Sequence, residues 1–266
     1  MKILVTVKQV PDTSGKVAVN PDGTLDRASM QTIINPDDLN AVEAALALKD
    51  ELGCKVVAFT MGPPPAEGML RELMAMGVDE GVLITAREFG GSDTYATSQI
   101  IAAGIDTYGV EDDDIILAGR QAIDGDTAQV GPQISEHLGL PVISYAQKIR
   151  EVNEAEKYIV VERQYDDRYH VVKAQLPCLL TALAELNEPR YMTPGGIFDA
   201  YAKEITVWGR KDLKEVEDSN LGLKGSPTQI AKASDKVRKG AGEKVELDPA
   251  ASADYIVGKL AEKHII

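Results

Sequence analysis

The stretch AGRQAIDGDTAQVGPQ, residues 118–133, decides the predicted fold of this chain. It follows an apolar run at residues 115–118, typical of a buried parallel strand, and it leads into residues 127–138, which have the pattern of a helix. The turn between them carries Gly119, Gly125, Asp124 and Asp126. Such a turn leaves free N–H groups and the positive end of a helix dipole at one spot, which favours a phosphate. The stretch therefore predicts a cradle for nucleotide phosphates, although glycine and aspartate also occupy such turns for conformational reasons alone.

Short apolar runs alternate with amphipathic stretches through the first half of the chain. The predicted strands are residues 3–7, 56–60, 81–85, 115–118 and 142–145, and the predicted helices are residues 41–52, 66–76, 94–108 and 127–138. Because parallel strands need helical crossovers, this alternation predicts an α/β fold, an open and mostly parallel sheet with helices on both faces.

Open sheets of this kind bind ligands outside the carboxyl ends of their strands, which here are followed by the loops at residues 8–35, 61–65, 86–93 and 119–126. In the first loop, Asn35 precedes Pro36, Asp37 and Asp38 in a pattern typical of a helix N-terminus. The second loop, MGPPP from Met61, turns the backbone sharply out of the sheet and can expose polar backbone groups to an adenine ring.

The third loop combines glycines with hydroxyl side chains. Gly90 and Gly91 are followed by Ser92 and Asp93, which we expect to cap the next helix, and Thr94 and Thr97 lie one turn apart on the same helix face. Capping explains the first pair, but it does not require a second threonine.

The pattern changes after residue 145. Residues 157–162 and 170–174 look like an antiparallel hairpin, residues 178–183 like another strand, and residues 197–208 like a short helix that runs into a strand. Residues 209–249 are polar, and residues 250–263 form an amphipathic helix pattern. A long tail with few apolar runs cannot readily fold on itself, so we expect it to wrap around a partner subunit, with a disordered linker as the alternative.

The composition excludes several classes of partner. The formal net charge of −14, from 28 basic and 42 acidic residues, argues against nucleic acid and an anionic membrane surface. The N-terminal apolar run is too short for a signal peptide or a membrane span, so we expect a cytoplasmic protein. Cys54 and Cys178 have no CxxC or Cys/His spacing, and we interpret them as reduced and buried.

Motifs for independent chemistry are lacking. The sequence has no G-x-x-x-x-G-K-[ST], G-x-G-x-x-G or G-x-S-x-G motif, and its three histidines, His137, His170 and His264, are scattered, so we expect no metal site. The acidic run at residues 112–114 is interpreted as a solvated turn. No convincing nucleophile and base are present, which fits chemistry performed by a bound cofactor.

Three separated motifs resemble one family. VKQVPD at residues 7–12, GRQAIDGD at residues 119–126 and LNEPRY at residues 186–191 together resemble the β subunit of electron transfer flavoprotein, over nearly the whole chain. The resemblance implies an adenine-nucleotide-binding, Rossmann-like domain over residues 1–200 and a C-terminal arm over residues 201–266 that wraps the α subunit.

Within that family, the turn after residue 123 is similar to the electron-bifurcating branch, whose members hold a complete FAD. AMP-holding members carry Asp-Asp-Asp-x-Asn-Gln-Thr-Gly, whereas this chain has DGDTAQVG at residues 124–131. Smaller residues at two of these positions should open room for more than a monophosphate.

The resemblance also implies which residues hold the cofactor. Adenine and ribose are expected near the first two loops and the pyrophosphate on the turn. A further hypothesis comes from the position of the third loop at the same edge of the sheet: Thr94 and Thr97 contact the ribityl or pyrophosphate part, and Gly90 and Gly91 leave the isoalloxazine face open to a nicotinamide. The expected cofactor-binding residues are Thr6, Asn35, Pro36, Asp37, Asp38, Met61, Gly90, Gly91, Thr94, Thr97, Gly119, Arg120, Gln121, Ala122, Ile123, Asp124, Gly125, Asp126, Thr127, Ala128, Gln129 and Val130, with no catalytic side chain.

The implied reaction is hydride transfer from NADH to this FAD, active only within a complex. One electron then passes to the α-subunit FAD and an acyl-CoA dehydrogenase, and the other to ferredoxin or flavodoxin. The segment at residues 188–200 resembles the dehydrogenase-docking segment, with Met192, Ile197 or Phe198 as the anchor, or else it is a structural loop. The alternatives are a non-bifurcating β subunit that holds AMP and a non-redox adenine-nucleotide-binding protein.

Overall fold

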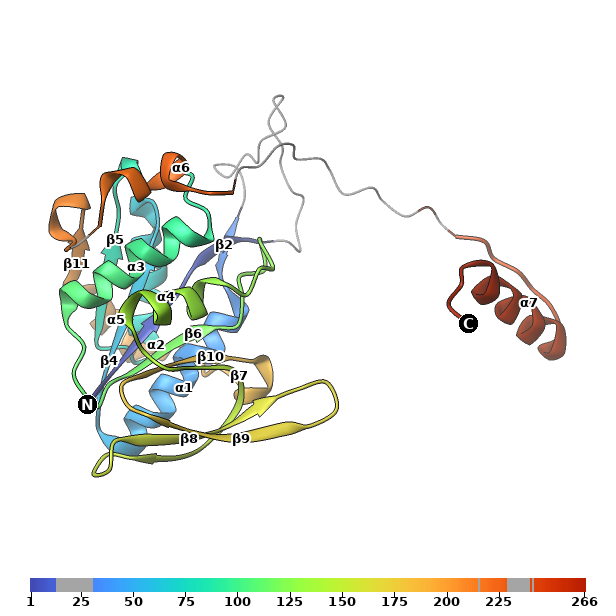
Figure 1. Ribbon diagram of the computed structural model, residues 1–266, viewed down its shortest axis with the longest axis horizontal. Coiled ribbons are helices and arrows are strands. Elements are labelled where there is room, and N and C mark those ends of the chain that lie inside the picture. Colours follow the sequence, from blue (N-terminus) through green and yellow to red (C-terminus); the bar gives the residue numbers. More distant parts are fainter. Residues whose placement is uncertain (13–30, 215, 229–239, 241) are drawn as a thin grey trace. The chain divides into compact units, whose positions relative to one another are not determined.

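A nine-stranded sheet forms the centre of the α/β unit (Figure 1). The computed structural model describes residues 1–12, 31–214, 216–228, 240 and 242–266. The sheet order is β11-β5-β4-β1-β6-β10-β7-β8-β9, in which neighbours from β11 to β7 are parallel and β7, β8 and β9 are antiparallel. The bounds are β1 Lys2–Thr6, β4 Lys55–Met61, β5 Glu80–Ile84, β6 Ile115–Gly119, β7 Val142–Asn153, β8 Tyr158–Gln164, β9 Tyr169–Gln175, β10 Cys178–Ala182 and β11 Ile205–Trp208; β2 Gln9–Pro11 and β3 Thr32–Ile34 form a separate antiparallel pair.

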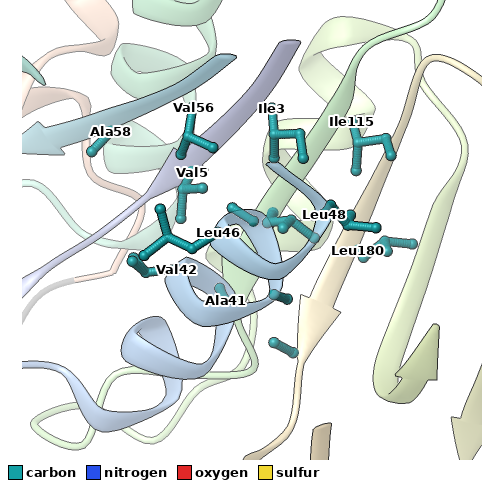
Figure 2. Close-up of a cluster of buried hydrophobic side chains, with 14 of the residues drawn as sticks. Ile3, Val5, Ala41, Val42, Leu46, Leu48, Val56, Ala58, Ile115 and Leu180 are labelled. Carbon is teal, nitrogen blue, oxygen red and sulfur yellow. The ribbon is translucent and has the colours of Figure 1, made fainter. Parts of the chain in front are cut away.

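Helices cover both faces of this sheet, which confirms the predicted α/β class. The helices are α1 Pro36–Leu52, α2 Glu67–Met76, α3 Thr94–Tyr108, α4 Val130–Leu138, α5 Pro194–Ala202, the single turn α6 Gly222–Gly225, and α7 Pro249–Glu262. Alternate strand residues bury on opposite faces: Ile3 and Val5 pack with α1 and α2, whereas Leu4 packs with α3 and α4. Figure 2 shows the first of these cores, with Val42 and Leu46 of α1 against β1. Burial of each such side chain contributes about 1.5–3 kcal/mol relative to its exposure.

The first helix begins at Pro36, which confirms the pattern of a helix N-terminus at residues 35–38 and extends the helix expected over residues 41–52. Two other predicted boundaries were wrong. The helix expected from residue 127 begins at Val130, because Ala128 has a left-handed φ of 52° that no helix accepts. The strand expected to end at residue 145 continues to Asn153, because it pairs with β8 from Ala146 onward.

The chain forms two compact units, Met1–Ala231 and Lys232–Ile266. Part of the predicted arm belongs to the first unit, since β11 pairs with β5 and Leu213 and Leu221 are buried against its core. The second unit contains α7, capped by Asp248, whose Oδ1 accepts N–H bonds from Ala250 and Ala251. The wrapping of a partner by the arm stays a prediction, and the predicted loop at residues 13–30 and much of the polar stretch at residues 229–241 lie outside the described residues.

No helix within the described parts of the chain is long and apolar enough to span a membrane.

Candidate nucleotide cradle

The predicted loops meet at the carboxyl ends of β1 and β6. These two strands are parallel neighbours. The chain adds β4 on one side of β1 and later adds β6 on the other side, so the order of strand addition reverses at β1. Such a switch point is where open α/β sheets form a ligand crevice. Thr6 ends β1 and is buried, and Met61 ends the adjacent strand β4.

The N-terminus of α1 is tied directly to the turn after β6. The buried Asp38 accepts a hydrogen bond from the Gly119 N–H at 3.1 Å and one from the Lys8 N–H at 2.8 Å. A Cβ on Gly119 would lie 2.3 Å from Asp38 Oδ1, so only glycine allows this approach. Burial raises the pKa of Asp38 to about 7, against the effect of these donors.

Asn35 occupies the N-cap position of α1 as predicted, but its side chain serves the neighbouring turn. It makes no cap bond to its own helix. Instead, its Nδ2 donates to the Gln121 carbonyl at 2.8 Å, and its Oδ1 accepts from the Ile123 N–H at 3.0 Å. The expected capping role of this side chain was therefore wrong, and the asparagine fixes the shape of the turn that follows β6.

Each carboxylate around the turn has a hydrogen-bond or ion-pair partner, and for Asp124 and Asp37 that partner is a cation. Lys8 Nζ contacts Asp124 at 2.7 Å, and Arg120 Nε contacts Asp37 at 3.2 Å. The Gln121 side chain donates a hydrogen bond to Asp126 at 2.9 Å, and Asp38 accepts from the Gly119 N–H as described above. Burial raises the pKa of Asp37, and Arg120 opposes that change. This pairing lowers the electrostatic cost of placing a further anion at the turn.

Lys8 was missed as a site residue in the sequence. Lys8 is a single charged residue after a buried strand. Its position at the carboxyl end of that strand is the feature of the sequence that could have indicated a site residue.

The approach to α4 exposes backbone donors. Asp126 and Ala128 both have left-handed φ values, 50° and 52°, which non-glycine residues adopt only at a cost of roughly 1–3 kcal/mol. Gln129 is the N-cap residue, but its side chain makes no cap bond to α4; its Oε1 accepts from the Thr94 hydroxyl at 2.9 Å. The first N–H groups of α4 thus have no side-chain cap within the described residues, and a Cβ on Gly125 would meet nothing within 4 Å. The geometry fits an anionic group at the start of α4.

The loop before α3 has the predicted cap. Asp93 Oδ1 accepts from the Ala96 N–H at 3.0 Å, and the half-buried Thr97 lies one turn along the helix from Thr94. The Gly90 carbonyl accepts from the Leu223 N–H, and Gly91, with a φ of 78°, packs against Leu223. The structure therefore joins Thr94 to the α4 side of the cradle and joins the two glycines to residues near α6.

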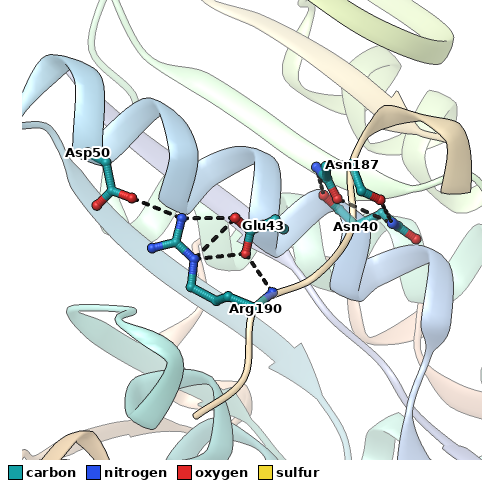
Figure 3. A network of polar contacts seen from close by, with 5 residues as sticks. All are labelled: Asn40, Glu43, Asp50, Asn187 and Arg190. Atoms are coloured by element: carbon teal, nitrogen blue, oxygen red, sulfur yellow. Dashed lines mark hydrogen bonds and ion pairs between the residues drawn. The ribbon is translucent and has the colours of Figure 1, made fainter. Parts of the chain in front are cut away.

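A second polar network anchors the predicted docking segment to α1 (Figure 3). Arg190 makes bidentate contacts to Glu43 and reaches Asp50 at 2.9 Å, while Asn187 and Asn40 exchange hydrogen bonds. Beyond this anchor, large apolar side chains are exposed on and before α5; they include Tyr191, Met192, Ile197, Phe198 and Tyr201.

The remaining candidates have structural roles. Both cysteines are free and buried, as predicted, and burial raises the pKa of Cys178 to about 12. The acidic turn is not simply solvated: Asp114 is fully buried and bonds to Lys2, and Asp113 pairs with the N-terminal amine. Among the residues described, no three His, Cys, Asp or Glu side chains gather in a metal-binding cluster.

Comparison with known proteins identifies relatives along the whole chain. Residues 22–217 match the family model described as the electron transfer flavoprotein domain. The chain is 54% identical to acryloyl-CoA reductase electron transfer subunit gamma of Anaerotignum propionicum, over all of both chains. It is also 50% identical to electron transfer flavoprotein subunit beta of Clostridium acetobutylicum and 50% identical to the caffeyl-CoA reductase-Etf complex subunit CarD of Acetobacterium woodii, again over all of each chain.

Proposed function

Because this chain belongs to the electron transfer flavoprotein family, as a β subunit, we propose that it is the NADH-oxidising, electron-bifurcating kind and holds a complete FAD in the cradle. Bound FAD would accept a hydride from NADH, then deliver one electron to the α-subunit FAD and an acyl-CoA dehydrogenase and the other to ferredoxin or flavodoxin. The protein would contribute binding and orientation.

The observation that carries this proposal is the combination of partnered carboxylates with uncapped N–H groups at α4. A pyrophosphate needs donors and is disfavoured by unpaired negative charge beside it; the start of α4 supplies donors, and Lys8 and Arg120 pair with Asp124 and Asp37. The open space beside Gly125 supports a ligand longer than a monophosphate.

Other predicted residues would orient the rest of the cofactor. Thr6, Met61 and residues 35–38 would surround adenine and ribose at the ends of β1 and β4, and the hydroxyls of Thr94 and Thr97 would donate to the ribityl or pyrophosphate part. Gly90 and Gly91 would leave the flavin ring accessible to a nicotinamide.

The names of the relatives support an acyl-CoA dehydrogenase-like partner, since one is an electron transfer subunit of an acryloyl-CoA reductase and another is a subunit of a caffeyl-CoA reductase-Etf complex. The segment with exposed Met192, Ile197 and Phe198 beyond the Arg190 anchor would receive this partner, because clustered exposed apolar side chains favour protein contacts. The arm at residues 201–266 would wrap the α subunit.

The test is the nucleotide content of the co-expressed αβ complex. After denaturation, two FAD per heterodimer and rapid bleaching of flavin by NADH support the proposal. One FAD with one AMP would identify a non-bifurcating β subunit. A stable, colourless lone subunit with reversible nucleotide binding would identify a non-redox nucleotide-binding protein.

A further inference from the structure

We propose that residues 220–228, the latch segment, are a built part of the cofactor site, with Ser226 and Asp93 as positioning residues for the loop at residues 88–94. This inference rests on the proposed function, because that loop is the one assigned to the flavin. The latch segment is remote in sequence from every predicted cofactor loop, and it lies at α6, beside the N-terminal end of α3 (Figure 1).

Hydrogen bonds fix the latch segment to the loop at three levels. The Asp93 N–H donates to Ser226 Oγ at 2.8 Å, and the Thr228 N–H donates to Asp93 Oδ2 at 2.9 Å. The Leu223 N–H donates to the Gly90 carbonyl at 3.1 Å. The Ser226 hydroxyl is buried and donates to the Gly222 carbonyl at 2.7 Å, which holds the segment in its own turn.

Close packing allows little freedom between the two pieces. Gly222 has a φ of 57°, and a Cβ there would lie 2.2 Å from the Glu88 carbonyl oxygen. On the other side, a Cβ on Gly91 contacts Leu223 at 3.1 Å. The backbones therefore approach where only glycine fits, which is typical of a specified contact and not of a passing surface loop.

Asp93 connects this contact to the predicted ligand residues. One carboxylate oxygen of Asp93 accepts from the Ala96 N–H at the start of α3, and the other accepts from the Thr228 N–H. The same side chain therefore holds both the first turn of α3 and the latch segment. Burial alone would raise the pKa of Asp93, but these N–H donors outweigh it and hold the pKa below its usual range. Thr94 follows Asp93 directly as the first residue of α3, so the residue whose hydroxyl reaches Gln129 lies next to this contact.

The latch segment belongs to the predicted arm, residues 201–266, and lies within the first compact unit. We infer that Ser226 acts on cofactor binding through the loop, without touching the cofactor.

The test compares Ser226→Ala with Ser219→Ala in the co-expressed αβ complex. Ser219 is a matched control because it lies in the same stretch and its hydroxyl makes only exposed contacts of 3.4 Å. Loss of one buried hydrogen bond corresponds to about a fivefold to hundredfold change in an equilibrium. In Ser226→Ala we expect hydrogen exchange at residues 88–94 to accelerate within that range, FAD to dissociate faster, and KM for NADH to rise while kcat changes little.

Residues 130–138 of α4 should exchange at the wild-type rate, which reports that the variant is folded. The proposal is overturned if Ser226→Ala matches Ser219→Ala, or if loop exchange rises while FAD release and KM for NADH stay at wild-type values. If the wild-type complex holds AMP instead of FAD, the proposed function fails independently of this proposal. The same comparison of Ser226→Ala with Ser219→Ala, by hydrogen exchange at residues 88–94 and by the rate of AMP release, then decides whether the latch segment positions the bound nucleotide.

Discussion

Replacing Gly119 by alanine should destabilise the chain far more than a single methyl group normally does. The added Cβ would lie 2.3 Å from Asp38 Oδ1 and 2.6 Å from the Asp38 nitrogen, where α1 meets β6. The bond from the Gly119 N–H to a buried carboxylate would be lost, at about 1.5–3 kcal/mol, and overpacking adds about 1–3 kcal/mol. We expect the free energy of unfolding to fall by about 2.5–6 kcal/mol, which lowers the melting temperature by about 5–24 °C in a chain of this size.

Gly125→Ala is the matched control for this prediction, because it adds the same methyl group to the same turn where nothing lies within 4 Å. Its free energy of unfolding should stay within about 0.5 kcal/mol of wild type. Both variants can be compared by thermal and urea unfolding followed by circular dichroism, in nucleotide-free complex. Equal melting temperatures for the two variants would refute the argument that close approach of α1 requires Gly119.

Three further substitutions and one labelling experiment test other parts of the structure. Because burial raises the pKa of Asp38 to about 7, only the folded chain holds that proton between about pH 4 and 7. The free energy of unfolding of wild type should therefore fall relative to that of Asp38→Asn as pH rises through this range, by at most about 1.4 kcal/mol per pH unit. Parallel plots of the free energy of unfolding against pH would contradict this. Arg190→Lys should cost about 1–3 kcal/mol in thermal unfolding, since lysine cannot bridge two carboxylates with a planar fork; an unchanged melting temperature would show that the bidentate contact is dispensable. Thr97→Trp should lower the FAD content of the complex, and full FAD stoichiometry would remove Thr97 from the site. Cys54 and Cys178 should react with a thiol reagent only after unfolding, because burial raises the pKa of both, and rapid labelling of native protein would contradict their burial.

The sequence predicted the cradle where local signals and the sheet-edge rule agree. Asn35 ends one βα loop, Asp38 lies in the first turn of the helix that follows it, and Gly119 ends the strand before another such loop. Parallel strands bring these loops together, so the contact followed from strand order. The start of α4 could not be predicted, because a left-handed Ala128 runs against the preference of alanine for a helix.

The latch segment was invisible in the sequence for a different reason. Ser226 lies 133 residues from Asp93 in a polar stretch without periodicity, so no pattern relates the two. Contacts of this kind depend on the tertiary path of the chain, and only the folded backbone shows them.

Helix α1 sets a fixed spacing between two regions of the subunit. Asp38 supports the cradle and Glu43 supports the segment at Arg190, and five residues of one helix separate them by about 7.5 Å along its axis. A single continuous helix therefore fixes the separation between the turn after β6 and the segment at Arg190, and neither can move along the helix axis without breaking its own contacts to α1.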